Sequence, residues 1–283
     1  MSSGRPGIIW LASYLKSGNT WMRLALASLR AGGQAVDINR FGGDEDTISA
    51  SRRHFDTLLD IDSADLTASE IVECRAEVYR RVAATLRESA LWKTHEACGA
   101  SPLGTPLFPA DATAGVVYLA RDPRDVAVSL ANHAGRTIDA AIAAMAEPGY
   151  TVSAATTGLP LQLPQRIGAW SENVESWLDH APCPPIVVRY EDMRHDTAAV
   201  LQRVADGIGI PSDTDAIAAA VAATAFDTLR AQEDQAGFAE RPQAAPRFFL
   251  SGTAGAWRDR LSPAQSARIE RDHGTAMARL GYC

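Results

Sequence analysis

The sequence predicts an α/β protein in which a central, mostly parallel β-sheet lies between helices in a three-layer domain. Short apolar runs, each long enough for one buried strand, alternate along the chain with longer segments whose apolar residues recur at helical spacing. The first apolar run, residues 8–12, leads through the polar loop "SYLKSGNTW" into a helical pattern. This order of strand, polar loop and helix is typical of proteins that bind an anion at a helix N-terminus.

Strands and helices can be placed from local signals. A helix is predicted over residues 67–88 because "TASE" has the capping-box pattern, with Thr67 as the cap and Glu70 three residues later. Another helix is predicted to begin with Asp122 as the cap and Pro123 in the first helical position. The predicted strands are residues 8–12, 91–95, 115–121 and 185–191, and the other predicted helices are residues 165–180, 197–208, 213–223 and 263–280.

Two long segments, residues 134–164 and 231–247, fit neither pattern throughout. The first combines an alanine-rich helical piece with a stretch that contains proline and glycine, and the second is polar and contains proline. Long irregular segments in a compact domain often form lids over a binding site. We therefore predict helical and loop insertions that form lids, with surface disorder as the open alternative.

Length and composition predict one folded domain over residues 1–283. The chain of 283 residues has 46% hydrophobic and 22% charged residues, which is typical of a folded, soluble protein. No apolar run reaches the roughly 20 residues that cross a bilayer, and the first residues lack the pattern of a signal peptide. We therefore expect a cytoplasmic protein with no membrane span.

Cysteine and charge patterns argue against several classes of site. The four cysteines are scattered and no histidine lies at a metal-ligand spacing from them, so the sequence indicates neither a disulfide framework nor a zinc site. The formal net charge of −7 argues against a nucleic-acid partner, because proteins that bind nucleic acid carry an excess of basic residues on one face. An anionic ligand must therefore be bound locally.

The loop after the first strand is P-loop-like but lacks the nucleoside-triphosphate motif. That motif, GxxxxGK[ST], places lysine directly after its second glycine, whereas Lys16 precedes Gly18 by two residues. The sequence predicts one phosphate-sized site formed by the Lys16 ammonium, the N-terminus of a helix that begins near Trp21, and backbone N–H groups. The residues that supply these N–H groups are Ser17, Gly18, Asn19 and Thr20. Trp21 itself is either a stacking surface for a ligand or a core residue.

Lysine is scarce in this chain and marks two positions. Of the 27 basic residues, only Lys16 and Lys93 are lysines, and the rest are arginines. A lysine carries a compact point charge on a flexible stem, in contrast to the planar fork of arginine. His95 lies two residues after Lys93 at a predicted strand end, so both side chains point the same way. A nearby cation favours the neutral imidazole, which makes His95 a candidate general base, with a structural histidine as the alternative.

A second anion site is predicted at the end of the third strand. Arg121 lies there beside the N-terminus of the following helix, and Ser129 lies about two turns into that helix. In open α/β sheets the ligands gather at the carboxyl ends of the strands, where both lysines, His95 and Arg121 are expected to meet. The alternative for Arg121 is a salt bridge with Asp122 or Asp125.

These motifs resemble those of the cytosolic-type sulfotransferases that use 3′-phosphoadenosine 5′-phosphosulfate (PAPS), including bacterial enzymes that sulfate natural products. The loop resembles the family's YPKSGTTW, with Leu15 for proline and Asn19 for threonine, and "KTH" at residues 93–95 resembles its catalytic lysine and histidine. "RDPRDVAVS" at 121–129, "RYEDM" at 189–193 and "ATAFDTL" at 223–229 resemble further family stretches. The matches run in family order from residue 13 to about residue 258.

The resemblance implies a role for each motif. The loop would hold the 5′-phosphosulfate group, and Lys16, Lys93 and His95 would be catalytic. Ser129 would hydrogen-bond Lys16 before the acceptor arrives, and together with Arg121 it would bind the 3′-phosphate. The other implied cofactor contacts, besides the loop residues and Trp21, are Tyr190, Thr224, Phe226, Ser251 and Gly252.

One stretch departs from the family. Its closing segment usually reads RKGxxGxW, whereas this chain has "LSGTAGAW" at residues 250–257, which keeps both glycines and the tryptophan but lacks both cations. The Ser251 hydroxyl and backbone N–H groups would then contact the 3′-phosphate, and Arg247 or Arg258 would supply the missing charge.

The sequence therefore predicts transfer of a sulfuryl group from PAPS to a hydroxyl or amine of a small-molecule or glycoconjugate acceptor. The reaction would need no metal and would release adenosine 3′,5′-bisphosphate (PAP). A secondary metabolite or glycoconjugate is favoured as the acceptor, whose contacts would come from residues 31–60, 134–164 and 231–247. The alternatives are a nucleotide-binding protein that has lost turnover and a small-molecule kinase, and a homodimer stays open.

Overall fold

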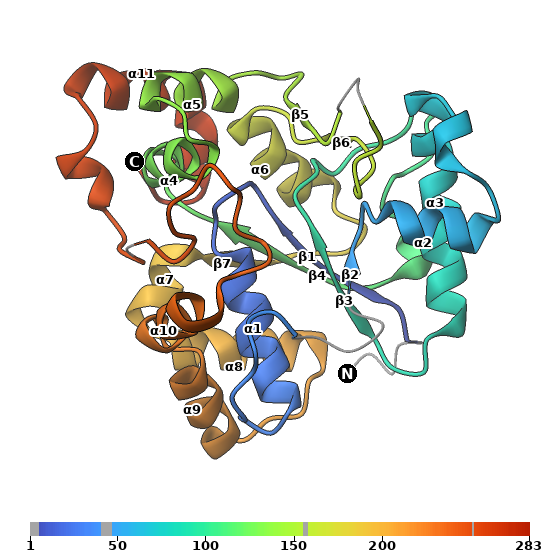
Figure 1. Cartoon of the computed structure of the whole chain (residues 1–283), viewed down its shortest axis with the longest axis horizontal. Coiled ribbons are helices and arrows are strands. Elements are labelled where there is room, and N and C mark those ends of the chain that lie inside the picture. Colours follow the sequence, from blue (N-terminus) through green and yellow to red (C-terminus); the bar gives the residue numbers. More distant parts are fainter. Residues whose placement is uncertain (1–5, 41–46, 155–157, 251) are drawn as a thin grey trace. The chain divides into compact units, whose positions relative to one another are not determined.

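The computed structural model describes residues 6–40, 47–154, 158–250 and 252–283, and Figure 1 shows the course of the chain. A mostly parallel, five-stranded sheet flanked by helices confirms the predicted fold class, and its strand order is β2-β3-β1-β4-β7. Both β1 and β2 run parallel to β3, with Ile8 opposite Ala90 and Ile48 opposite Lys93. The strands are β1 (Ile8–Ser13), β2 (Thr47–Ile48), β3 (Ala90–Thr94), β4 (Thr113–Ala120) and β7 (Ile186–Arg189), and β5 (Thr151–Val152) pairs separately with β6 (Gln165–Arg166).

The described helices match most of the predicted positions. The Thr67 cap is confirmed, because its hydroxyl accepts from the Glu70 N–H while Glu70 accepts from the Thr67 N–H. Asp122 likewise caps the helix that follows β4. The helices are α1 (Asn19–Arg30), α2 (Arg52–Leu59), α3 (Ala68–Thr85), α4 (Pro123–Ala134), α5 (Ile138–Met145), α6 (Trp170–His180), α7 (Tyr190–His195), α8 (Thr197–Ile208), α9 (Thr214–Ala223), α10 (Phe226–Ala236) and α11 (Pro263–Arg279).

Differences from the predictions include two element boundaries and one missed strand. The helix predicted at residues 165–180 begins only at Trp170, because residues 165–166 pair with β5 and Gly168, with φ 71°, lies between the two elements. The fourth strand ends at Arg189 and α7 begins directly after it. The edge strand β2 was not predicted because two residues are too few for a strand pattern.

The prediction of an irregular segment at residues 231–247 was wrong for its first part, since α10 continues to Ala236. The buried face of this helix carries Leu229 and, one turn later, the carboxylate of Glu233. That carboxylate accepts hydrogen bonds from the backbone N–H groups of Phe248 and Phe249 at 2.7 and 2.9 Å. A buried acidic residue breaks the apolar periodicity by which a helix is recognised.

The chain forms two compact units. The first comprises Met1–Tyr14, Gly43–Tyr118 and Glu147–Ile186, and the second comprises Leu15–Gly42, Leu119–Ala146 and Val187–Cys283. The boundary after Tyr14 falls within the "SYLKSGNTW" loop. The single domain over residues 1–283 stays a prediction.

Aromatic side chains fill the core of the first unit. The Trp10 ring in β1 packs edge-on against Tyr79, Trp92 and Phe108, with centroids 5.0, 6.1 and 4.9 Å away. The Trp10 indole N–H donates to the Thr113 hydroxyl at 2.9 Å, so its burial leaves the donor satisfied. This core fixes the positions of β1 and β3, at whose ends the predicted loop and His95 begin.

A buried ion pair lies in the same unit. Arg75 of α3 donates to both carboxylate oxygens of Glu96, and the two side chains are 1% and 3% exposed. Burial raises the pKa of the Tyr79 hydroxyl to about 12, and this hydroxyl accepts from Arg75 at 2.7 Å and donates to the Ser49 carbonyl at 3.1 Å. The charges of Arg75 and Glu96 compensate each other, and Tyr79 accepts a further hydrogen bond from Arg75. A buried charge needs such partners.

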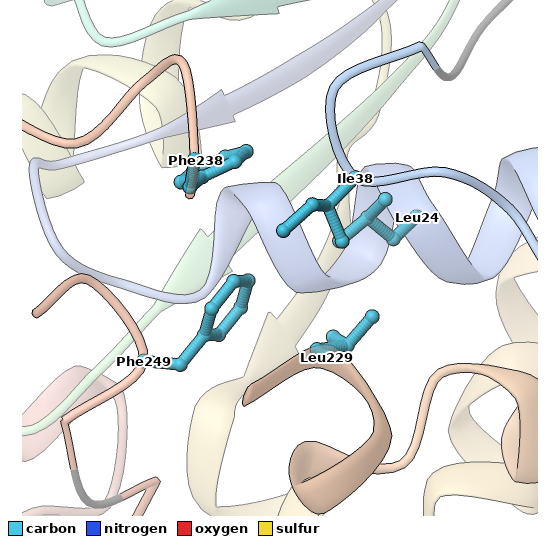
Figure 2. Close-up of a cluster of buried hydrophobic side chains, with 5 residues drawn as sticks. All are labelled: Leu24, Ile38, Leu229, Phe238 and Phe249. Carbon is cyan, nitrogen blue, oxygen red and sulfur yellow. The ribbon is translucent and has the colours of Figure 1, made fainter. Parts of the chain in front are cut away.

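An apolar cluster forms the part of the second unit that supports the loop. Figure 2 shows Leu24 of α1 and Leu229 of α10 facing one another, with Ile38, Phe238 and Phe249 completing the cluster. Trp21, Val36, Phe226 and Phe248 pack against its edge. The cluster therefore fixes the position of α1 relative to the segment after α10.

Within the described residues, no helix has both the length and the apolar character needed to cross a bilayer.

Replacing Glu96 by alanine should lower the free energy of unfolding by about 3 to 5 kcal/mol, because the Arg75 charge stays buried without its partner. Urea denaturation followed by tryptophan fluorescence measures this loss. The matched control is Glu77→Ala, which removes an ion pair with Arg81 whose side chains are 49% and 51% exposed. The control should change stability by less than about 0.5 kcal/mol. Equal losses in the two variants would contradict the buried pair.

Candidate functional site

The loop between β1 and α1 turns through two residues with left-handed backbone conformation. Lys16 has φ 65° and Gly18 has φ 94°. A residue with a side chain pays about 1 to 2 kcal/mol in this region, so its conformation must be fixed by its surroundings. The Lys16 carbonyl accepts from Arg121 Nη1 at 3.3 Å, which contributes to fixing it. Strain of this kind concentrates at functional sites.

The N-terminus of α1 follows this turn and presents backbone donors. The helix begins at Asn19, two residues earlier than predicted, so Asn19 and Thr20 are part of its first turn. Its cap is Gly18, which has no side chain that could accept from the N–H groups of the first turn, and no acidic residue lies in that turn. Such a terminus attracts an anion through its N–H groups and its dipole. In the described part of the chain, the buried Ser17 hydroxyl beside it has no hydrogen-bond partner.

The Lys16 side chain contacts α4 and the segment after α10. Its ammonium nitrogen lies 3.2 Å from His133 Nδ1 and 4.2 Å from the centroid of the Phe248 ring. Sequence reasoning singled out neither partner. A signal for His133 existed, because it lies four residues after Ser129 and so on the same face of one helix.

Arg121 follows β4 directly and makes four contacts within the second unit. Its guanidinium donates to the Lys16 carbonyl and, through Nη2, to the Thr253 carbonyl at 3.1 Å, and it lies 4.3 Å from the centroid of the Tyr190 ring. The alternative of a salt bridge holds in part, because Asp125 lies 4.0 Å from Nη2. Among the residues that the structure describes, the buried Nε atom of Arg121 has no partner.

Carboxylates occupy the N-terminus of α4. Asp122 accepts from the Arg124 N–H at 2.9 Å, and buried Asp125 accepts from the N–H groups of Gly255 and Trp257 at 2.6 and 2.9 Å. Asp122 therefore already occupies one N–H group of the helix terminus. Anion binding at this point would depend on the Arg121 guanidinium, as the sequence predicts.

The remaining predicted cofactor contacts lie around the loop in the second unit. Burial raises the pKa of the Tyr190 hydroxyl, although nearby Arg121 lowers it, and this hydroxyl donates to the Gly252 carbonyl at 3.0 Å. Thr224 is buried and its hydroxyl donates to the Ala220 carbonyl at 2.7 Å. Phe226 begins α10 and lies directly over Gly252. Ser251 lies outside the described residues.

Trp21 makes core contacts but is only half-buried. Its indole N–H donates to the Thr224 carbonyl at 3.0 Å, and its ring meets the Tyr190 ring edge-on at 5.9 Å. Arg194 lies over the Trp21 ring at 5.7 Å. The side chain is half-buried, so both the core role and the stacking role stay open.

His95 is held in one tautomer within the first unit. It follows β3 directly, and its Nδ1 lies 3.0 Å from the Ser13 carbonyl oxygen and 3.1 Å from the Ser13 hydroxyl. A carbonyl oxygen only accepts, so Nδ1 must carry the proton and donate. The lone pair is then on Nε2, the form that a general base needs. Lys93, two residues earlier in β3, pairs in register with Leu11 of β1.

Backbone contacts fix the segment that carries His95. The buried Asn173 side chain of α6 donates to the His95 carbonyl at 3.0 Å and to the Ile167 carbonyl at 2.9 Å, and Trp177 Nε1 donates to the Glu96 carbonyl at 2.8 Å. Sequence analysis missed this role of Asn173. The available signal was an amide at a core-facing position of an otherwise apolar helix face.

The residues present fit a phosphorylated nucleotide. Two buried polar atoms, Ser17 Oγ and Arg121 Nε, are without a partner in the described residues. Glycine is required where backbone approaches an aromatic ring, because a Cβ atom at Gly18 would lie 2.8 Å from Tyr190 and one at Gly252 would lie 2.5 Å from Phe226. Among the described residues, no group of three or more side chains has the composition of a metal site.

The fold is an α/β sheet protein in which a left-handed turn joins the first strand to the N-terminus of the first helix. The chain belongs to the sulfotransferase family, since the model of the sulfotransferase domain matches residues 6–281.

The relatives of this chain are distant in sequence. Sulfotransferase 2B1 of Rattus norvegicus is 24% identical over 174 residues, which cover 59% of this chain and 48% of the rat protein. The chain thus spans about half the length of the rat relative that it matches. Cytosolic sulfotransferase 16 of Arabidopsis thaliana is 23% identical over 279 residues, which cover 94% of this chain and 75% of the plant protein. The crystal structure of retinol dehydratase in complex with androsterone and inactive cofactor PAP shares the fold, with a TM-score of 0.59 and 21% identity over 97% of this chain and 81% of that chain.

Gly18→Ala should destabilise the protein more than Gly32→Ala does. Both glycines have positive φ, 94° and 68°, which costs a residue with a side chain about 1 to 2 kcal/mol. Only at position 18 would the new Cβ atom lie 2.8 Å from the Tyr190 ring, whereas nothing lies within 4 Å at position 32. Overpacking should add about 1 to 3 kcal/mol to the loss, measured by urea denaturation. Combining Gly18→Ala with Tyr190→Leu should recover part of it, and identical losses in the two alanine variants would refute the close approach.

Proposed function

We propose that the chain transfers a sulfuryl group from PAPS to a hydroxyl or amine of a small acceptor and releases PAP. The observation that carries this proposal is the placement of Lys16. Its left-handed backbone lies at the N-terminus of α1, next to a glycine cap and a buried serine hydroxyl. One of the two lysines of the chain thus lies where a phosphate group and a developing negative charge would need it.

Residues of the second unit would hold the donor nucleotide. The N–H groups of residues 17–20 and the Lys16 ammonium would bind the 5′-phosphosulfate group. Arg121 and Ser129 would bind the 3′-phosphate, and the buried Nε atom of Arg121 supports this role. The aromatic faces of Trp21 and Phe226 would stack on adenine, with Tyr190, Thr224, Ser251 and Gly252 as further contacts.

His95 would act as the general base of the reaction. Its Nε2 would take the proton of the acceptor while the acceptor oxygen bonds to sulfur, a role worth roughly 10²- to 10⁴-fold in rate. The bond between sulfur and the 5′-phosphate oxygen breaks, and Lys16 would stabilise the electron pair left on that oxygen. One such donor is worth about 3 to 4 kcal/mol. Lys93 would stabilise the sulfuryl oxygens, in a transition state as loose as that of phosphoryl transfer.

The acceptor is proposed to be a small molecule or a glycoconjugate. The solved structure of retinol dehydratase contains androsterone, a small molecule, which supports a small acceptor in this fold. Residues 31–60, 134–164 and 231–247 would line the acceptor side. A bacterial secondary-metabolite acceptor and a cytoplasmic location stay proposals, since the relatives named above come from rat and a plant.

Calorimetric titration with PAP should give binding in the micromolar range, and ATP with magnesium should give none. Lys16→Ala should weaken PAP binding by about ten- to a hundredfold, because one charge-assisted contact to a phosphate is worth roughly 1.5 to 3 kcal/mol. His95→Asn should leave PAP affinity unchanged and lower turnover with PAPS by roughly 10²- to 10⁴-fold, because the proposed base acts on the acceptor proton and not on the nucleotide. The affinity for PAP thus tests the role of Lys16, and the rate of turnover tests the role of His95.

The titration and the turnover assay together distinguish three functions. PAP binding, with turnover that His95→Asn lowers by roughly 10²- to 10⁴-fold, supports the sulfotransferase. PAP binding without turnover across phenol, alcohol, sugar and amine acceptors supports a nucleotide-binding protein that has lost catalysis. Binding of ATP with magnesium but not of PAP would assign the loop to a kinase.

The charge that the closing segment lacks is proposed to come from Arg258. Arg247 is held in an ion pair with Asp234 at 2.6 Å, whereas the Arg258 guanidinium lies over the Trp257 ring at 4.7 Å, next to Gly255. Arg258→Ala should therefore weaken PAP binding about tenfold and reduce its dependence on salt. Arg247→Ala, which has the same change of charge, is the matched control and should change affinity less than twofold. The opposite ranking would exchange the two roles.

A further inference from the structure

Lys16 is held at both ends within the second unit. Its backbone has φ 65°, and its carbonyl accepts from Arg121 at 3.3 Å. At the tip of the side chain, the ammonium nitrogen lies between His133 Nδ1 at 3.2 Å and the Phe248 ring at 4.2 Å. The His133 and Phe248 rings are themselves in edge contact, with centroids 6.2 Å apart. The ammonium thus lies against an imidazole edge and an aromatic face.

The chemistry of the pair assigns donor and acceptor. An ammonium group has three donors and no acceptor, so His133 Nδ1 must offer its lone pair. The imidazole is then neutral and carries its proton on Nε2. The cation–π contact with Phe248 attracts the same charge but constrains its direction less than a hydrogen bond does. Of these two contacts, His133 therefore constrains the position of the ammonium more tightly.

The position of His133 on α4 favours the contact. His133 lies in the last turn of the helix, which Gly135 ends with φ 60°. The negative end of the helix dipole stabilises a cation there, and Lys16 supplies that cation. Among the flanking charges, Arg247 beside Phe248 is paired with Asp234 at 2.6 Å, so its charge is compensated. Ser129, one turn earlier on α4, faces the same side as His133.

We propose that His133 is a positioning residue for Lys16: the neutral imidazole accepts a hydrogen bond from the ammonium and aims it at the phosphate position beside the N-terminus of α1. The catalytic consequence rests on the proposed function, but the contact itself does not. Loss of the acceptor removes this directional hydrogen bond, which the face of the Phe248 ring does not replace.

The first test measures the pKa of Lys16 by NMR in protein labelled with carbon-13 at lysine Cε. The chain has only two lysines, so the spectrum has two such signals, which Lys16→Arg and Lys93→Arg assign. A hydrogen bond to a neutral acceptor stabilises the ammonium, so His133→Leu should lower the Lys16 pKa by about half a unit to one unit. His133→Asn, which keeps an acceptor near the Nδ1 position, should restore most of it.

Two controls separate positioning from general damage. Asn132→Leu introduces the same side chain one position earlier on α4 and should leave the Lys16 pKa unchanged. The Lys93 signal reports on the first unit and should stay constant in all variants. Equal Lys16 pKa values in the wild type and in His133→Leu, with folding confirmed by circular dichroism, would overturn the proposal.

The second test is kinetic and applies once PAPS turnover is established. His133→Leu should lower kcat about tenfold or more while the KM of the acceptor stays within twofold, and His133→Asn should recover most of kcat. A rise in acceptor KM without loss of kcat would overturn the catalytic consequence. If the wild type shows no turnover, the proposed function fails, while the NMR result still decides the contact between His133 and Lys16.

Discussion

The backbone turn at Lys16 and Gly18 is the constraint on which the proposed phosphate site depends. Two left-handed residues in three reverse the chain between the end of β1 and the start of α1, so the free N–H groups of the helix open toward the loop. The turn is possible only because Gly18 has no Cβ atom where the Tyr190 ring packs. It also directs the Lys16 side chain to α4 and its carbonyl to Arg121. The loop is therefore kept in shape by contacts from distant parts of the second unit.

What sequence could predict was local. The Thr67 capping box and the Asp122 cap follow from neighbouring residues and were found where expected, and the four main strands were found with ends within two residues of those predicted. Missed features depend on contacts between segments far apart in the chain: His133 meets Lys16 across 117 positions, and Asp125 binds Gly255 across 130. The spacing of His133 from Ser129 was a weak local signal, whereas the residues around Asp125 do not indicate Gly255. Buried Glu233 misled the helix assignment for the same reason, since its partners lie beyond the helix.

The closing segment shows how a binding element keeps its shape without its usual cations. Asp125 accepts from two of its backbone N–H groups, Arg121 donates to the Thr253 carbonyl and Tyr190 donates to the Gly252 carbonyl. The side chains in these hydrogen bonds belong to residues outside the segment, and the segment contributes only backbone groups. The described residues 252–257 are therefore held without a lysine or an arginine of the segment itself. Affinity for an anion and conformation of the segment are separate properties here.

The buried pair of Arg75 and Glu96 limits how this chain can vary. Both side chains are almost fully enclosed, and each compensates the charge of the other. A single mutation at either position passes through a protein with an uncompensated charge in its core, whereas simultaneous replacement by two apolar residues need not. Among homologues the two positions should therefore change together or not at all. Glu96 directly follows His95 in the chain. The pair therefore links α3, which carries Arg75, to the segment that carries the candidate base.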